Sequence, residues 1–290
     1  MRRVGLVVHP KRPIDRPLNA LREWAESNDV GVVQLRAGNH DRNVAPFGDV
    51  QECDLVVAIG GDGTVLTALR AAAESSTPVL GVACGSLGAL AAVTAGELHD
   101  ALAQYESGSW RRRQIPALEV AVDGERVAWA LNDFVAVRRA GQQLAVDVTV
   151  DEELYARMAG DGVIVATAFG SSAYSMAAGG PLLVLNTDTF VVTPLTIHGG
   201  SIPPLVVPGR CGLAIDVYPG FGGFDVEIDG HTVELDGTKF SFSLVPDRST
   251  LVGLGEPELG LTPLRRRGLI ADSPRMVARG DRATRKGSGA

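Results

Sequence analysis

The sequence predicts an N-terminal doubly wound parallel α/β domain followed by an all-β, sandwich-like domain. Strand and helix signals alternate over the first hundred residues, which is typical of parallel strands joined by helices. Beyond Trp110 the pattern changes to short, β-rich segments with hairpin signals. The 290 residues, 45% of them hydrophobic, are enough for two hydrophobic cores.

Short apolar runs mark the strands of the first domain, and amphipathic segments between them mark its helices. A helix is expected to begin near Asp15 and Pro17, with Leu18, Leu21 and Trp24 on one face. A second helix is expected over 65–73 and a third after residue 97. The expected buried strands are 4–8, 31–35, 54–59 and 79–83.

Alternating patterns and Asp-Gly turns define the second domain. Asp123-Gly124 and Asp229-Gly230 each separate two β-rich segments and predict hairpins. Only a turn or two of helix is expected there, after Tyr174. The predicted boundaries are 1–109 for the α/β domain and 110–250 for the β domain, followed by a return segment over 251–271. The polar stretch 272–290 is predicted to be a disordered tail.

Composition narrows the class of protein. A net charge of −7 argues against nucleic-acid binding by bulk electrostatics. No signal peptide or apolar span of membrane length is evident, so we expect no membrane association. The three cysteines are widely spaced, which predicts reduced thiols and a cytoplasmic protein.

One glycine turn carries the strongest chemical signal. "GGDGT" places Asp62 between Gly61 and Gly63, where an apolar strand meets a helix. Helix N-termini bind phosphate, and glycines let main chain approach it closely. A carboxylate would repel phosphate, unless it accepts a proton from an attacking hydroxyl or helps to hold a metal. The alternative is that Asp62 only caps the helix.

Three further stretches favour a catalytic role for Asp62 over a capping role. In order, "GGDGT" is followed by "GVACGSLGAL" (81–90), "ALND" (130–133) and "DGVIVATAFGSSAYSMAAGGPLL" (161–183). Together they resemble the motifs of the NAD kinase family. The resemblance spans about residues 54 to 245. It implies an N-terminal α/β domain, a C-terminal β-sandwich and an active site between them.

The resemblance also implies roles for individual residues. Asp62 corresponds to the catalytic carboxylate near the 2′-hydroxyl of the adenosine ribose of NAD. The expected phosphate-binding residues are Gly60, Gly61, Gly63 and Thr64. The expected NAD-binding residues are Asn132 and Asp133 for ribose, Asp161 for the nicotinamide amide, and Ser172, Ala173 and Tyr174 for adenine. The sequence assigns no side chain as a metal ligand.

Ordinary structural roles remain open for several of these residues. Asn132 and Asp133 fit a turn, Tyr174 fits a core or interface, and Asp161 fits a surface ion pair with an arginine. The arginine runs 111–113 and 265–267 fit solvated faces, or contacts with ATP phosphates where the fold brings them to the cleft.

The family pattern is not matched everywhere. Ala83 replaces the usual asparagine, Ala89 a phenylalanine, Asp133 a glutamate, and Phe169 stands where a small polar residue is usual. These differences leave the proposed base and the phosphate turn in place, and put the identity of the acceptor in doubt.

The sequence thus predicts an NAD kinase that transfers the γ-phosphoryl group of ATP to NAD with the help of Mg²⁺. The family implies a homodimer or homotetramer. Two alternatives stay open: a kinase of the same fold acting on another small-molecule hydroxyl, and a non-catalytic nucleotide-binding regulator. Donor preference, the choice between NAD and NADH, and allosteric control are left undecided by the sequence.

Overall fold

The structure is a computed structural model of the chain. It describes residues 1–38, 42–85, 87–91, 93–139, 141–185, 187–256 and 260–271. The predicted disordered tail, 272–290, lies outside the described residues. In the part of the chain that is described, no helix is long and apolar enough to cross a membrane.

The N-terminal part is a doubly wound α/β layer, as predicted. Its parallel strands lie in the order β2-β1-β3-β4, and β5 pairs with β4. The strands are β1 (Arg3–Val8), β2 (Gly31–Gln34), β3 (Leu55–Gly60), β4 (Val79–Ala83) and β5 (Val93–Thr94). The helices are α1 (Asp15–Ser27), α2 (Asp62–Ala72) and α3 (Leu98–Glu106).

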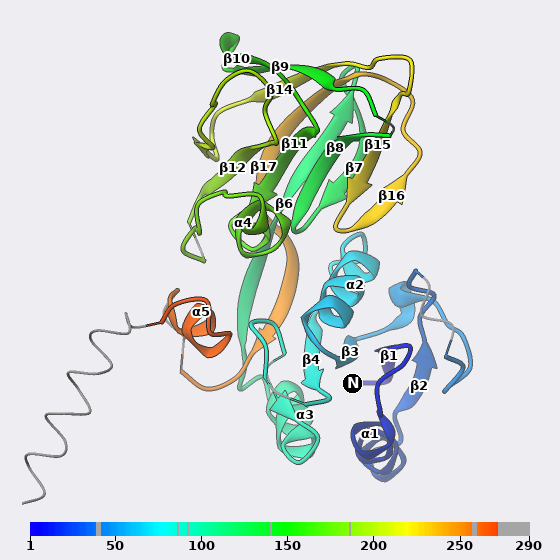
Figure 1. The fold of residues 1–290 in the computed structure, drawn as a ribbon. Coiled ribbons are helices and arrows are strands. Elements are labelled where there is room, and N and C mark those ends of the chain that lie inside the picture. Colours follow the sequence, from blue (N-terminus) through cyan, green and yellow to red (C-terminus); the bar gives the residue numbers. More distant parts are fainter. Residues whose placement is uncertain are drawn as a thin grey trace, which may run out of the picture.

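These helices cover both faces of the parallel strands. The apolar face of α1, with Leu18, Leu21 and Trp24, packs in one cluster with α3 and with Leu6. Helix α2 packs on the opposite face, where Leu69 shares a cluster with Val56. Successive side chains of a strand point to opposite faces, so strands covered on both sides are apolar throughout. Figure 1 shows α2 apart from the α1 and α3 pair.

The second part is a β-sandwich with one short helix after Ala173, as predicted, and a second short helix follows in the return segment, where none was predicted. Its strands are β6 (Arg111–Val122), β7 (Glu125–Ala130), β8 (Asp133–Arg138), β9 (Leu144–Val150), β10 (Glu153–Gly160), β11 (Gly162–Thr167), β12 (Thr189–Leu195), β13 (Leu205–Pro208), β14 (Leu213–Tyr218), β15 (Phe224–Ile228), β16 (His231–Val233) and β17 (Lys239–Gly253). The helices are α4 (Tyr174–Ala177) and α5 (Thr262–Arg266).

Both predicted hairpins form. Asp123-Gly124 joins β6 to β7, and Asp229-Gly230 joins β15 to β16. Both residues of each pair have positive φ (51° and 84°, then 50° and 75°), as the tight hairpin turns of twisted strands require.

Two long strands connect the parts. β6 and β17 pair antiparallel along most of their length, and β17 also pairs with β14 at one end and with β4 at the other. Both parts therefore share one eleven-stranded mixed sheet, while an antiparallel sheet of order β13-β12-β11-β8-β15-β16 faces it across the sandwich core. Figure 1 shows β6 and β17 running between the two parts. The predicted boundary at 250 falls within β17, and the domain limits stay a prediction.

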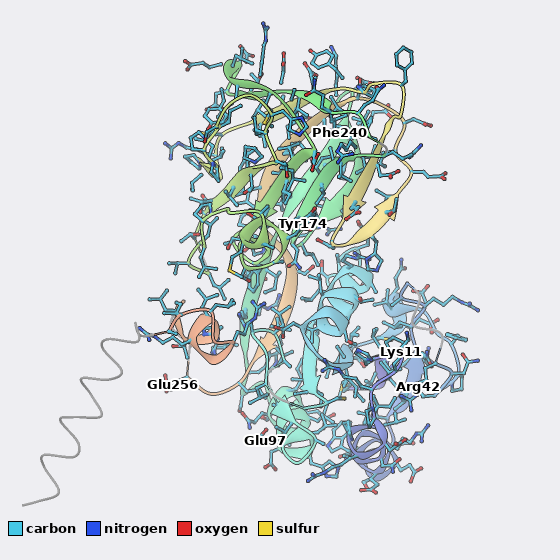
Figure 2. All side chains as sticks on the ribbon, in the orientation of Figure 1. Lys11, Arg42, Glu97, Tyr174, Phe240 and Glu256 are labelled. Atoms are coloured by element: carbon cyan, nitrogen blue, oxygen red, sulfur yellow. The ribbon has the colours of Figure 1, made fainter. Side chains whose placement is uncertain are left out.

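The sandwich core is built around aromatic rings. Phe134 of β8 lies 4.9 Å from Phe240 of β17, centroid to centroid, and both side chains are buried. Figure 2 labels Phe240 inside the β-sandwich. This core anchors β8, whose first residue belongs to the predicted acceptor-binding turn.

Candidate functional site

Asp62 lies where β3 passes into α2, at the carboxyl edge of the parallel strands. Gly61 is the N-cap residue and Asp62 is the first residue of the helix, without a side-chain capping bond. The carboxylate accepts hydrogen bonds from two main-chain N–H groups of another loop instead, Ala89 at 2.9 Å and Leu90 at 3.0 Å. The capping alternative is therefore wrong, and Asp62 is held by the loop that follows β4.

The glycines around Asp62 differ in what a side chain at each position would contact. A Cβ on Gly60 would overlap the hydroxyl of Thr64, and a Cβ on Gly88 would overlap the Asp62 carboxylate. A Cβ on Gly63 would meet nothing within 4 Å. Gly60 and Gly88 thus permit close internal packing, and of these three Gly63 is the one that faces open space. The Thr64 hydroxyl is buried and has no partner among the described residues.

A small cavity lies directly beside the carboxylate. Its volume is about 70 Å³, and its two charged lining residues are Asp62 and Arg267. The other lining residues are Gly63, Leu66, Ala89, Leu90, Asn132, Phe169, Ser172 and Ala173. Five predicted site residues therefore meet here, from both parts of the fold: Asp62, Gly63, Asn132, Ser172 and Ala173.

The turn that carries Asn132 is held by a buried acid, Asp229. Its carboxylate accepts hydrogen bonds from the N–H groups of Leu131, Asn132 and Asp133, at 3.2, 2.6 and 3.2 Å. Its side chain has no exposed surface, and Arg70, at the end of α2, lies 3.5 Å away. Asp229 thus connects the helix that begins at Asp62 to the predicted ribose-binding turn. The sequence indicated Asp229 only as a hairpin residue.

Two neighbouring carboxyl groups are buried at this turn. Burial raises the pKa of Asp133 to about 7, and the nearby charge of Asp229 adds to that effect. Burial likewise raises the pKa of Asp229, opposed by its main-chain hydrogen bonds and by Arg70. Asp133 is 4% exposed and does not line the cavity. Asn132 and Asp133 therefore differ, because only the first faces the site.

Two other predicted site residues lie away from Asp62. Asp161 immediately precedes β11, whereas Ser172 follows the opposite end of that strand. The Asp161 carboxylate pairs with Arg138 at 2.5 Å, and this contact lowers its pKa. Tyr174 begins α4 and is 43% exposed without lining the cavity (Figure 2). The structure does not bring Asp161 or Tyr174 to the carboxylate of Asp62, and their assigned roles stay predictions.

Among the side chains that the structure describes, Arg113 and Arg267 come from the two arginine runs and reach the site. Arg113 donates to the carbonyl of Ala89 at 2.9 Å, and its guanidinium lies 5.6 Å from the centroid of the Phe169 ring. Arg267 donates to the Ser172 hydroxyl at 2.8 Å, and its Nε lies 4.0 Å from Asp62. Arg113 thus supports the loop that holds Asp62, and Arg267 borders the cavity.

No cluster of three or more metal-ligating side chains occurs among the described residues. Of the described residues that line the cavity, Asp62 is the only one with a carboxylate. Mg²⁺ at phosphate-transfer sites is held by one or two carboxylates together with phosphates of the substrate. A single carboxylate fits a metal of that kind only if phosphates of the substrate supply most of the other ligands.

The family of this chain follows from comparison with known proteins. Residues 4–109 match the model of the ATP-NAD kinase N-terminal domain, and residues 131–236 match that of the C-terminal domain. An NAD kinase of Haloarcula marismortui is 35% identical over 234 residues, which cover 76% of this chain and 79% of the relative. An NAD kinase of Acidobacterium capsulatum is 34% identical over 228 residues, covering 75% and 80%.

Solved structures show the same fold. The structure of yeast NADH kinase complexed with NADH matches with a TM-score of 0.76 at 22% identity, covering 94% of this chain and 89% of that one. An NAD kinase from Archaeoglobus fulgidus in complex with ATP matches with a TM-score of 0.72 at 20% identity, covering 93% and 100%. With both domain models matched in order and the fold shared throughout, the chain belongs to the ATP-NAD kinase family.

Proposed function

We propose that this protein is an ATP-dependent NAD kinase, which phosphorylates the 2′-hydroxyl of the adenosine ribose of NAD to give NADP. The observation that carries the proposal is the carboxylate of Asp62, held beside a cavity that also receives Asn132 and Ser172. The relatives are NAD kinases, and the two structural neighbours were solved with NADH and with ATP.

In the proposed reaction Asp62 acts as general base. A carboxylate has about four acceptor positions, and the N–H groups of Ala89 and Leu90 use two of them. A remaining lone pair accepts the proton of the 2′-hydroxyl. The ribose oxygen then bonds to the γ-phosphorus, and the bond from that phosphorus to the β,γ-bridging oxygen breaks. Its electron pair leaves with ADP.

The other predicted residues position the two substrates. Gly63 and the first turn of α2 present main-chain N–H groups to phosphate. The Asn132 amide is suited to the ribose diol, and Ser172 with Ala173 forms the adjoining wall. We retain Gly60, Gly61 and Thr64 as parts of the phosphate turn, and Asp133, Asp161 and Tyr174 as acceptor-site residues, as proposals.

Mg²⁺ is proposed as cofactor, and the phosphates of ATP would supply most of its ligands. When bound, the ion neutralises phosphate charge. Ala89 and Phe169, which depart from the family pattern, both line the cavity, so we expect them to affect which acceptor is bound.

A cytoplasmic location is proposed because Cys53, Cys84 and Cys211 are free thiols, as is usual in a reducing compartment. Self-association as a homodimer or homotetramer is proposed from membership of the family alone. Light scattering coupled to size-exclusion chromatography measures the number of subunits.

The test is incubation of the purified chain with ATP, Mg²⁺ and NAD, coupled to an NADP-specific dehydrogenase. Steady formation of NADP is the expected result. Phosphorylation of another alcohol without any NADP would establish the same-fold kinase instead. Binding of NAD in calorimetry without release of ADP would establish the regulator.

A further inference from the structure

Arg267 reaches the site from the end of the chain. It caps α5 (Thr262–Arg266), which follows β17 and the return of the chain from the β-sandwich. Leu264 of α5 is 1% exposed, so apolar packing fixes the helix against the body of the protein. The side chain of Arg267 extends from this fixed position to Ser172 and Asp62. One cation therefore spans the predicted base and the predicted acceptor segment.

Arg267 brings a positive charge to the cavity. Among the described residues that line the cavity, Arg267 is the only one with a positive charge, and both proposed substrates are anions. The protein as a whole carries a net charge of −7, so it offers no general attraction to phosphate. Phosphoryl transfer is accelerated by cationic groups placed where charge develops on the moving phosphoryl group. Arg267 has the location for that task.

The geometry leaves the guanidinium able to bind a further group. Its Nε lies 4.0 Å from the Asp62 carboxylate, beyond direct hydrogen-bond distance, while another nitrogen donates to Ser172 at 2.8 Å. A guanidinium has five N–H donors in a planar fork that matches phosphate oxygens, and the bond to Ser172 uses one of them. Its side chain is 32% exposed, so phosphate can approach it from solvent.

We propose that Arg267 is a substrate-binding residue that contacts the phosphoryl group during transfer and then the 2′-phosphate of the product. This inference rests on the proposed function and deepens it. The covalent changes are those given above, in which the hydroxyl proton passes to Asp62 and the electron pair of the broken bond leaves with ADP. Arg267 exchanges no proton and forms only charge-assisted hydrogen bonds to phosphoryl oxygens.

The experiment compares Arg267→Gln and Arg267→Lys with Arg265→Gln, an exposed arginine two residues earlier. For Arg267→Gln we expect kcat to fall about 10²-fold, as for loss of one donor to a transition-state anion, with a smaller change in KM for NAD. Arg267→Lys should recover part of the loss, because it keeps the charge without the fork. Arg265→Gln should match wild type.

Equilibrium binding measures a quantity that would stay unchanged if the contact of Arg267 were only structural. Calorimetry of wild type and Arg267→Gln with NAD and with NADP gives the ratio of the two Kd values. Contact with the 2′-phosphate predicts that the variant weakens NADP at least about tenfold more than NAD. Thermal unfolding of both variants should remain close to wild type, because Leu264 still docks α5.

Two results would overturn the proposal. One is an unchanged kcat together with an unchanged ratio of Kd values in Arg267→Gln. The other is a faster Arg267→Gln enzyme, which would show that the guanidinium obstructs the acceptor. Failure of wild type to form NADP would reject the proposed function instead, and the binding ratio would still decide whether position 267 recognises a 2′-phosphate.

Discussion

Replacement of Asp62 by asparagine separates the chemical role of this side chain from its structural role. Asparagine keeps the shape of the side chain and one carbonyl acceptor, and it cannot take a proton from the ribose hydroxyl. We expect kcat to fall by at least about 10²-fold, the lower end for a positioned acid–base group. That loss corresponds to about 2.7 kcal/mol of transition-state stabilisation.

The same substitution has a structural cost that can be worked out from the contacts. In the Asp62→Asn variant the new amide NH₂ group would face one of the two N–H donors, Ala89 or Leu90, that the carboxylate accepts. One donor left unsatisfied costs about 1–3 kcal/mol. A typical domain is stable by about 5–15 kcal/mol, so the variant should remain folded but less stable.

Urea unfolding and the coupled NADP assay, carried out on the same preparation, measure both effects. Asp100→Asn, an exposed acid that is also in the first turn of a helix, is the matched control and should change neither quantity. A folded Asp62→Asn variant with kcat within about threefold of wild type would refute the role of Asp62 as base, because general acid–base groups contribute at least about 10²-fold.

Three further substitutions test the surroundings of Asp62. Gly88→Ala places a methyl group on the Asp62 carboxylate and should lower kcat by at least about tenfold in the coupled assay, since small displacements at reacting groups are costly. Asp133→Asn removes a carboxyl group whose pKa is raised to about 7, so it should raise Tm at pH 8 and much less at pH 5. Asp229→Asn disturbs three main-chain hydrogen bonds, which should cost about 1–3 kcal/mol in urea unfolding and raise KM for NAD.

The pH dependence for Asp133 follows from its pKa in the two states. Between the ordinary aspartate pKa of 3.8 and about 7 the folded protein binds the proton that the unfolded chain has lost. Stability contributed by this group is therefore present at low pH and falls as pH rises through that window, by about 4 kcal/mol at most. Asp123→Asn, at an exposed turn, is the control. Equal stabilisation by Asp133→Asn at pH 5 and pH 8 would contradict the assignment.

Two results would contradict the predictions for Gly88→Ala and Asp229→Asn. A fully active Gly88→Ala enzyme would show that the carboxylate need not stay on the N–H groups of the loop. An Asp229→Asn variant of unchanged stability and KM would show that the turn at Asn132 is fixed by other contacts.

Much of the fold could be predicted from local sequence because its determinants are local. The face formed by Leu18, Leu21 and Trp24 has the helical period, and these side chains are buried in α1. Asp123-Gly124 and Asp229-Gly230 take positive φ at low cost, so their hairpins form where the sequence indicated. The sharing of one sheet by both parts depends on the pairing of β17 with β4, more than a hundred residues apart along the chain, and local patterns carry no signal for it.

The candidate site also has features that the sequence predicted and features that only the tertiary structure decided. By itself the sequence determined the glycine turn, the carboxylate of Asp62 and the segments at Asn132 and Ser172, because each lies in a contiguous motif. Only the tertiary structure decided that Asp133 is buried, that Asp229 fixes the neighbouring turn and that Arg267 returns to the cavity. The physical reason is that burial, electrostatic environment and contacts between distant segments arise when the chain packs, and no short stretch of residues encodes them.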